Sequence, residues 1–588
     1  MRAATLTDYL KRSLFLGLIA ALAAIYLVAV GIVSAFAERP LITGGLNLGL
    51  SVPLAIITLI AYIAGNTPKN WIAPTSGVLH RVIPPVITGA LGGAGLAFLI
   101  ALNEFADPTE ILPQLTPATA EIIGLGRPYP EGAVLIVALG ASLGVVASIL
   151  HMLTSRARRS FVTAIASVVV FSLIEPLLRV MLLQFGVVLG NPLPNDLARL
   201  LYENGGLTQI GALIVFLVSL GLALVWQYRG TQVKGRYSAL PQGQRTGLQL
   251  GGIAVSALIL LVLPAIIGSF LSETVGTIGL YLLMGLGLNI VVGYAGLLDL
   301  GYVAFFAVGA YATAMLTSPA SSLGLEMNFF VALPLVMAIA AITGIAIGAP
   351  VLRLRGDYLA IVTLGFGEIV RILFLSDWLR PVFGGAQGIL EIPAPVVFGF
   401  DLFEPRVLYY PILLAVILGA VISWSLANSR VGRAWNAMRE DEDVAEATGI
   451  NTTRYKLLAF AFGAVFGCVA GALFSIKIGS VFPQRLDLLV SITVLSLIIL
   501  GGMGSIRGVI VGALVLVGLP ELLREFGEYR LLIYGVVLVT MMLLRPEGLL
   551  PSATRRRELH EEEPPEVQYR HEAGGETGGP GISVGQTA

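Results

Sequence analysis

The sequence holds little charge, little histidine and almost no cysteine. Asp, Glu, Lys and Arg make up 12% of its 588 residues and their charges cancel, so the excess of cations that nucleic-acid binding needs is missing. The one cysteine, Cys468, excludes an internal disulfide. None of the four histidines stands with acids or cysteine at metal-ligand spacing, so we expect no metal site. They are His80, His151, His560 and His571.

Two motifs of nucleotide-binding proteins and metalloenzymes are also missing. No Gly-x-x-x-x-Gly-Lys-Ser/Thr occurs, so the chain is not expected to bind ATP through a P-loop. No His-Glu-x-x-His occurs either. We therefore predict no catalytic residues, no cofactor and no enzymatic activity on this chain.

Long apolar runs are abundant. The chain is 56% hydrophobic with a mean hydropathy of +0.87, whereas soluble domains are roughly 45–50% apolar. Runs of about 20 apolar residues, the length that crosses a bilayer as a helix, recur along nearly the whole chain. We predict an all-α polytopic transmembrane protein with about sixteen membrane segments. They lie near 14–36, 42–64, 82–102, 132–153, 161–187, 208–227, 249–270, 275–292, 297–317, 329–351, 357–376, 408–427, 457–478, 488–502, 506–523 and 530–545.

The charges between these segments predict their orientation. Lys and Arg cluster before the first segment and after the fourth and the sixth, whereas the loop of about 104–131 is acidic. Because basic loops mark the cytoplasmic side, this pattern places the N-terminus inside the cell. An even number of crossings then places the C-terminus inside as well.

Composition divides the chain into three parts. Residues 1–247 form a membrane extension of about six helices that ends in a polar linker of about 228–247. Residues 248–550 carry the other apolar segments. The tail of 551–588 is rich in Gly and Glu, a composition typical of disordered chain.

A charged loop interrupts the apolar segments at 430–456. Its stretch GRAWNAMREDEDVAEATGI (Gly432–Ile450) holds two Arg and five acids. The pattern predicts a short amphipathic helix with Trp435, Met438 and Ala445 on one face, which Gly449 ends. A helix that lies on lipid favours Lys and Arg, so the acids argue against membrane contact. Docking onto a soluble partner and a merely solvated loop both remain open.

Two membrane segments are interrupted by glycine, at Gly293–Gly301 and at Leu500–Gly508. Paired glycine-broken segments in the two halves of a transporter indicate a substrate path, although glycine also permits close helix packing. Candidate path residues are Gly293, Tyr294, Gly296, Asp299, Gly301, Gly501, Gly502 and Gly504.

Charged residues at membrane depth are costly and often functional. Asp299 lies in the first glycine-broken segment, where its carboxylate could meet a substrate ammonium group. Glu368 and Arg371 are three residues apart, which predicts a structural pair on one helix face. Glu175 and Arg179, four apart in the extension, are expected to pair in the same way.

Four blocks resemble a known family. EATGI (Glu446–Ile450) resembles a shortened form of the Glu-Ala-x-x-x-Gly loop of ABC importer permeases. Gly285–Leu316, Leu352–Phe374 and Leu500–Ala513 look like the LivM-type permease of branched-chain amino acid ABC importers, in matching order and spacing. The resemblance covers about 250–550 and leaves the extension outside the usual core.

The resemblance implies import of branched-chain or related amino acids across a bacterial inner (plasma) membrane. It implies two ABC ATPase subunits that bind the ATP and Mg, a second related permease and an external solute-binding protein, in a surround of membrane lipid. In the 430–456 loop, contact with an ATPase is expected at Arg433, Trp435, Met438, Arg439, Glu446, Ala447 and Gly449. Gly449 follows Glu446 by three residues, which departs from the broader importer pattern.

The alternative is a stand-alone secondary carrier or channel for a small polar solute such as urea or an amide. Such a protein needs no ATPase and would use intramembrane carboxylates such as Asp299, Glu368 or Glu175 for coupling ions. It has no need of a docking helix, so the charged loop favours the importer.

Overall fold

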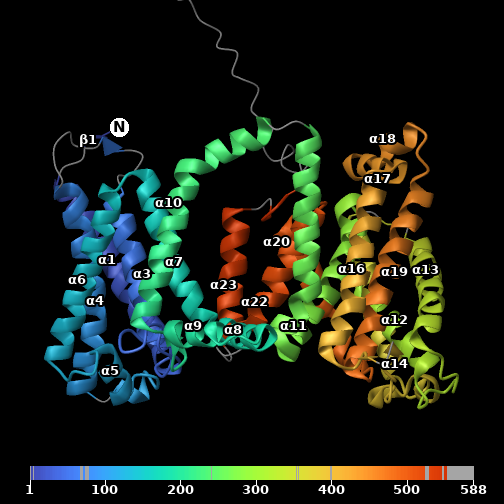
Figure 1. Ribbon diagram of the computed structural model, residues 1–588, viewed down its shortest axis with the longest axis horizontal. Coiled ribbons are helices and arrows are strands. Elements are labelled where there is room, and N and C mark those ends of the chain that lie inside the picture. The colour runs from blue at the N-terminus through green and yellow to red at the C-terminus, as the bar shows by residue number, and fades with distance from the viewer. Residues whose placement is uncertain are drawn as a thin grey trace, which may run out of the picture.

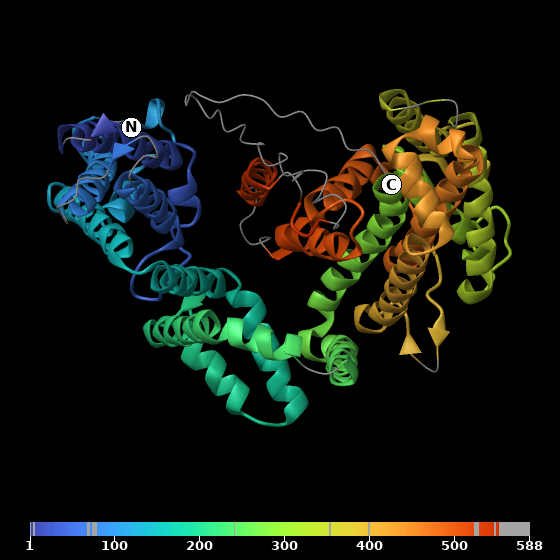
Figure 2. The same ribbon diagram turned by 90° about the horizontal axis from the view of Figure 1, so that it is seen from above.

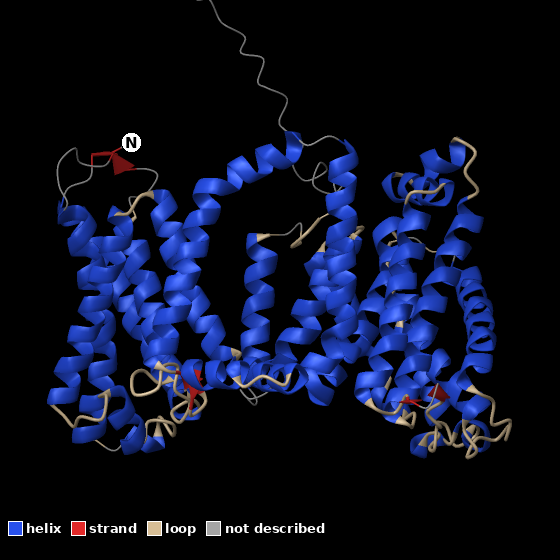
Figure 3. Cartoon of the chain, viewed as in Figure 1, coloured by secondary structure: helices blue, strands red, loops and turns tan. Residues whose placement is uncertain are grey.

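The computed structural model describes residues 2–3, 6–66, 71–72, 79–106, 108–239, 242–351, 354, 356–397, 400–522, 529–545 and 548–551. Helices dominate it (Figure 3), which confirms the all-α prediction. Within the described ranges, the strands form three two-residue pairs: β1 (Arg2–Ala3) with β2 (Trp71–Ile72), β3 (Tyr202–Glu203) with β4 (Gly206–Leu207), and β5 (Val396–Val397) with β6 (Phe400–Asp401). Apart from residue 551, the tail predicted to be disordered lies outside the described residues.

The first part of the extension is a helical bundle whose helices cross through glycine. A Cβ atom on Gly89 would lie 2.2 Å from the carbonyl oxygen of Gly140, so α4 and α6 pack backbone against backbone, as small residues allow in membranes. The elements are α1 (Leu6–Ala29), α2 (Ile32–Ala35), α3 (Leu48–Gly65), α4 (Leu79–Phe105), η1 (Pro108–Glu110), α5 (Pro117–Ile123) and α6 (Glu131–Met152).

The predicted segment of 161–187 is broken in two. Helix α7 (Ser155–Leu173) and the following helix, α8 (Glu175–Leu189), meet at Ile174 with a bend of 73°. Pro176 lies in the first turn of α8, where proline is tolerated, whereas inside a continuous helix it would remove a hydrogen bond and clash with the preceding turn. Helices α9 (Leu193–Leu201) and α10 (Gln209–Ala239) follow.

The second part of the chain begins with one long, kinked helix. The predicted segments of 249–270 and 275–292 are joined in α11 (Gln242–Leu288), which turns at Gly268 (φ 77°). Next come a π-helical turn, η2 (Asn289–Tyr294), then α12 (Val303–Thr317), α13 (Phe329–Val351), α14 (Asp357–Leu375), α15 (Arg380–Phe383), η3 (Gly385–Gln387) and α16 (Pro405–Ala427).

The remaining elements close the core around one continuous apolar cluster. They are α17 (Arg430–Glu440), α18 (Glu442–Ala447), α19 (Thr452–Ile478), η4 (Pro483–Arg485), α20 (Leu488–Gly501), α21 (Ile506–Ala513), η5 (Leu514–Gly518), α22 (Leu519–Leu522) and α23 (Tyr529–Leu544). Leu286 of α11, Phe305 of α12, Phe460 of α19 and Leu497 of α20 are among its buried members.

The predicted count of about sixteen membrane segments is not confirmed. In the described part of the chain, 11 helices are long and apolar enough to span a membrane, or 12 if α7 and α8 form one span. Helices form at nearly all predicted places, but several are too short to cross alone. Helix α12 has 15 residues, α21 has 8 and α23 has 16, whereas a crossing needs about 20.

The two ends of the helices carry different loops. Figure 1 shows β1, near the N-terminus, at the same end as α17 and α18, and α5, α8 and α9 at the other end. The acidic loop of about 104–131, which contains α5, is thus opposite the N-terminus, as the charge pattern predicted. Seen from above, α1–α6 form one group and α12–α19 another, with α7–α11 running between them (Figure 2).

Candidate functional site

The 430–456 loop folds as two short helices, although the sequence predicted one. Asp441 breaks the helix with an extended backbone (φ −156°, ψ 113°), and its carboxylate accepts a hydrogen bond from the Val444 amide at 3.0 Å. A side-chain oxygen at the N-cap satisfies an otherwise free helix amide. Glu442 and Asp443 then lie in the first turn of α18, where the helix dipole favours acids. The acidic run from Asp441 to Asp443 is the sequence signal of a second helix start, and the prediction of one helix did not use it.

One face of these helices packs against the protein itself. Trp435, Met438 and Ala445 are 0%, 5% and 2% exposed. All three are buried as predicted, but Trp435 and Met438 lie on α17 and Ala445 on α18 rather than on one helix. The Trp435 Nε1 donates to the carbonyl oxygen of Tyr455 at 2.8 Å. Lys456, which the sequence did not single out, lies 2.5 Å from the Glu442 carboxylate, with only 5% of its side chain exposed. These contacts hold both helices against α19.

The opposite face is open and charged. Arg433, Glu446, Ala447 and Gly449 are all exposed, and the side chain of Val444 is exposed among them at 58%. Gly449 has φ 93° and follows Thr448, the C-cap residue of α18, which matches its predicted role as a helix stop. The predicted docking residues therefore divide into two sets, because Trp435 and Met438 face inward and can act only by holding the helices in place.

Arg439 connects the loop to the first glycine-broken segment, and Asn289 connects that region to the second. Its Nη1 donates to the carbonyl oxygen of Gly293 at 2.9 Å. Gly296 has φ 73°, and a Cβ atom there would lie 2.9 Å from the Arg439 Cγ. Asn289, fully buried, accepts a hydrogen bond from the Gly504 amide at 2.8 Å. We call Asn289, Gly293, Gly296, Arg439 and Gly504 the glycine junction.

Glycine is required at the junction for close approach and for backbone conformation. A Cβ atom on Gly293 would lie 2.2 Å from the Asn289 Oδ1, and one on Gly501 would lie 2.0 Å from the carbonyl oxygen of Gly508. Gly502 has φ 120°, which side chains rarely permit. Tyr294, a predicted path residue inside the first segment, is 7% exposed. The junction is thus a tightly packed contact.

Asp299 lies in a second, separate turn of the same segment. It is 2% exposed, and its Oδ1 accepts a hydrogen bond from the Gly301 amide at 2.9 Å. Among the described residues its Oδ2 has no hydrogen-bond partner. The Leu300 amide donates to the Thr363 Oγ1 of α14 at 3.1 Å, so α14 fixes this turn. A buried carboxylate oxygen without a partner is costly, so Asp299 is a candidate functional group.

The two predicted intrahelical pairs form. The Arg371 Nε lies 3.0 Å from each oxygen of the Glu368 carboxylate. Arg179 lies 3.7 Å from Glu175, whose side chain is 5% exposed. In each pair the two residues lie on one face of their own helix, at a spacing that makes helical side chains neighbours.

One hydrolase-like pattern occurs but lacks the structure of a catalytic site. Gly140-Ala-Ser-Leu-Gly144 has the Gly-x-Ser-x-Gly spacing of a nucleophile elbow, which requires a strand-to-helix turn. Here it lies inside α6, and the Ser142 hydroxyl donates to the carbonyl oxygen of Leu139 at 2.7 Å. Among the described residues, no group of three or more His, Cys, Asp or Glu could hold a metal ion.

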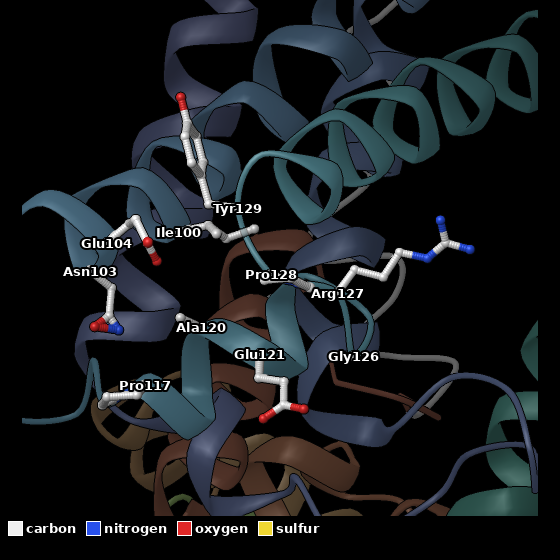
Figure 4. Close-up of a pocket in the computed structure, with 10 residues that line it drawn as sticks. All are labelled: Ile100, Asn103, Glu104, Pro117, Ala120, Glu121, Gly126, Arg127, Pro128 and Tyr129. Atoms are coloured by element: carbon white, nitrogen blue, oxygen red, sulfur yellow. The ribbon is translucent and has the colours of Figure 1, made fainter.

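The extension contains a pocket of about 390 Å³ between α4, α5 and the loop that precedes α6 (Figure 4). Asn103 and Glu104 come from α4, whereas the Arg127 guanidinium points away from both. Ligand sites place a few convergent polar groups in an apolar cavity, and this pocket does not. It is lined by Ile100, Asn103, Glu104, Pro117, Ala120, Glu121, Gly126, Arg127, Pro128 and Tyr129.

The chain is similar to known transport permeases. A family model described as branched-chain amino acid transport system, permease component, matches residues 270–544. The high-affinity branched-chain amino acid transport permease LivM of Salmonella typhimurium is 43% identical over 303 residues, which is 48% of this chain and 70% of that relative. LivM of Escherichia coli K12 is 38% identical over 403 residues, which cover 64% of this chain and 93% of that relative. LivH of the same organism is 25% identical over 288 residues, which cover 46% of this chain and 91% of that relative. No solved structure matches this chain.

The match with E. coli LivM reaches into the extension. It covers 64% of the 588 residues, or about 376, which is more than the 341 residues that remain after position 247. The extension is therefore not wholly outside the family. With LivM relatives at 38–43% identity over most of their own length, the chain belongs to the branched-chain amino acid transport permease family and is of the LivM type.

Proposed function

We propose that this chain is the membrane-spanning permease subunit of an ABC importer. In this role it moves branched-chain or related amino acids inward, and ATP hydrolysis on separate partner chains drives the movement. The relatives are named as branched-chain amino acid transport permeases, which supports the substrate class. The chain contributes the path and the coupling loop, and the ATP and Mg are held by the partners.

The observation that carries the proposal is the two-sided 430–456 loop. Its open face presents Val444 and charges of both signs to solvent. Its other face packs against the protein, and there Arg439 bonds to the glycine junction. A partner that moves the two helices of the loop therefore also moves Arg439 of α17, whose side chain is bonded to the first glycine-broken segment. A stand-alone carrier has no use for such a lever.

The proposal includes a defined set of partners. They are two ABC ATPase subunits, one of which docks on the open face of the loop, a second related permease in the membrane and an external solute-binding protein at the opposite end. The chain then lies in a bacterial plasma membrane with both termini and the 430–456 loop in the cytoplasm. The basic loops that lie on the same side of the helices as the N-terminus of the chain support this orientation.

Purification in mild detergent from the native membrane tests the ATPase partners. We expect P-loop ATPases to accompany the native chain in stoichiometric amount, and a Glu446→Lys variant to retain at least tenfold less of them. A reversed charge at the centre of an interface costs about 2 kcal/mol or more, and tenfold corresponds to about 1.4 kcal/mol. Mass spectrometry of the purified material measures the ratio.

A matched variant, Glu121→Lys, reverses an exposed acid of α5 at the opposite end of the helices and should retain the ATPases. A well-folded native chain that purifies alone and moves solute in liposomes without ATP would sink the importer and support the stand-alone carrier or channel.

Asp299 supplies a second test, because its free carboxylate oxygen is a candidate partner for the substrate ammonium group. Asp299→Asn keeps an oxygen to accept from the Gly301 amide but removes the negative charge. We expect ATP-driven uptake of leucine to fall at least tenfold, with unchanged yield of the assembled complex. Uptake within about twofold of the native rate would remove Asp299 from the path and leave it as a turn residue.

A further inference from the structure

Helix α14 carries a charged pair on its outer surface, within a membrane span. The span is Tyr358–Leu375, and Glu368 and Arg371 are 40% and 29% exposed in their side chains while they remain paired. Their mutual contact neutralises the net charge, but both groups keep open sides that need further hydrogen-bonding partners.

Two other spans of the core, α13 and α16, have no such charged pair among their described residues. The exposed side chains of α13 include Ile342 at 68% and Ile345 at 46%, and those of α16 include Leu414 at 58% and Val421 at 57%. Helix α13 contains no charged residue, and in α16 only Arg406, in the first turn, is charged. Those faces have the composition of surfaces that contact lipid, and α14 does not.

The depth of the pair makes contact with lipid more costly. Glu368 follows Tyr358 by ten residues and precedes Leu375 by seven, so at 1.5 Å per residue it lies about 10 Å inside the nearer end of the helix. Arg371 can extend toward that end, but the shorter Glu368 side chain cannot. Ionisable groups at such depth face other protein or water rather than hydrocarbon.

The residues around the pair form a surface that suits another helix. Among the described residues, no atom lies within 4 Å of the position of a Cβ atom on Gly365, one turn before Glu368. Ile361 and Ile372, at 64% and 54% exposure, flank the pair. Small residues that permit close approach, next to polar groups that bond across helices, are the features of helix contacts in membranes. We call Ile361, Gly365, Glu368, Arg371 and Ile372 the α14 face.

We propose that the α14 face binds the second, related permease of the complex; this inference rests on the proposed function. The LivH relatives, a second kind of permease protein, match 46% of this chain, so a partner of the same architecture would offer apolar helices with polar groups to pack here. The other side of α14 bears Thr363, which accepts a hydrogen bond from Leu300 beside Asp299. A partner on the α14 face thus stands one helix away from the turn that holds Asp299.

Site-directed photocrosslinking in the assembled complex tests the inference. The photoreactive residue p-benzoylphenylalanine is placed at Ile361 or Ile372 of the α14 face, and at Ile342 of α13 or Leu414 of α16 as matched exposed controls. After illumination in native membranes, we expect Ile361 and Ile372 to link to the second permease at least fivefold more than either control. Mass spectrometry of the linked product identifies the partner.

A second variant pair separates the contact from simple helix placement. Glu368→Leu with Arg371→Leu makes the α14 face as apolar as that of α13, so lipid contact would leave assembly unchanged, whereas the proposed contact predicts at least a fivefold lower recovery of the second permease. Links from the α14 face to a second copy of this chain, or to lipid alone, in a preparation that contains the second permease would overturn the inference while the importer stands. A preparation with no second permease would overturn both.

Discussion

Replacing Arg439 with alanine is expected to lower ATP-driven leucine uptake at least tenfold while the ATPases remain bound. The Arg439 guanidinium bonds the carbonyl oxygen of Gly293 at 2.9 Å, and the base of the same side chain packs on Gly296. The loop keeps its other anchors, Trp435 and Lys456, so the open face stays in place. What is removed is the connection through which a movement of the loop reaches the first glycine-broken segment.

The measurement compares two rates in proteoliposomes that contain the whole complex. Uptake of leucine should fall, whereas ATP hydrolysis should stay within about threefold of the native rate, so the ratio of ATP consumed to leucine moved rises. Arg430→Ala serves as the control, because Arg430 is exposed at the start of α17. An unchanged ratio in Arg439→Ala would show that Arg439 does not transmit the movement. Loss of the ATPases would show that it positions the open face instead.

Local patterns in the sequence predicted the parts of the loop that depend on local physics. The spacing of Trp435, Met438 and Ala445 predicted a buried face because side chains three or four residues apart share a helix side. Glycine at 449 predicted the stop because its backbone tolerates positive φ. The break at Asp441 was missed, because a cap competes with an uninterrupted helix by only about 1 kcal/mol. A run of good helix formers conceals such a small difference.

The glycine junction was beyond prediction because its contacts are distant in the sequence. Arg439 and Gly293 are 146 residues apart, and Asn289 and Gly504 are 215 apart. Each segment was recognised on its own as glycine-broken, but no pattern within one segment indicates which carbonyl an arginine will reach. Asn289 reads as one polar residue in an apolar run, and Lys456 as the ordinary basic end of a span.

The number of spans was overestimated for a related reason. A high hydropathy shows that a segment is buried away from water, but it can be buried either in lipid or in the interior of the protein. Helix α12 is short and largely buried, with Tyr302 before it and Tyr311 within it both nearly inaccessible, so its apolar residues serve the core rather than a lipid-facing crossing. The kink at Gly268 and the break at Ile174 depend on single residues. Hydropathy averaged over a stretch of about 20 residues does not detect them.

Gly301→Ala is expected to have the largest effect on stability of any variant considered, although it adds a single methyl group. A Cβ atom on Gly301 would lie 1.9 Å from the carbonyl oxygen of Thr363, a backbone atom that cannot turn aside as a side-chain tip would. Relief requires α14 to move away from the turn that holds Asp299. Overpacking of a tight contact costs about 1–3 kcal/mol, and we expect the upper end because both partners are backbone.

The comparison is with Gly221→Ala, an exposed helical position in α10. No atom of the part of the chain that the structure describes lies within 4 Å of its Cβ position, so alanine should be neutral or favourable there. We expect Gly301→Ala to lose most of its monodisperse complex on size exclusion after brief heating at a temperature that the control survives. Because Thr363 and the α14 face lie on one helix, the displacement should also loosen whatever α14 contacts on its outer side. Full stability of Gly301→Ala would mean that the turn and α14 separate readily, so that the close contact between them is only one of the arrangements this part of the permease adopts.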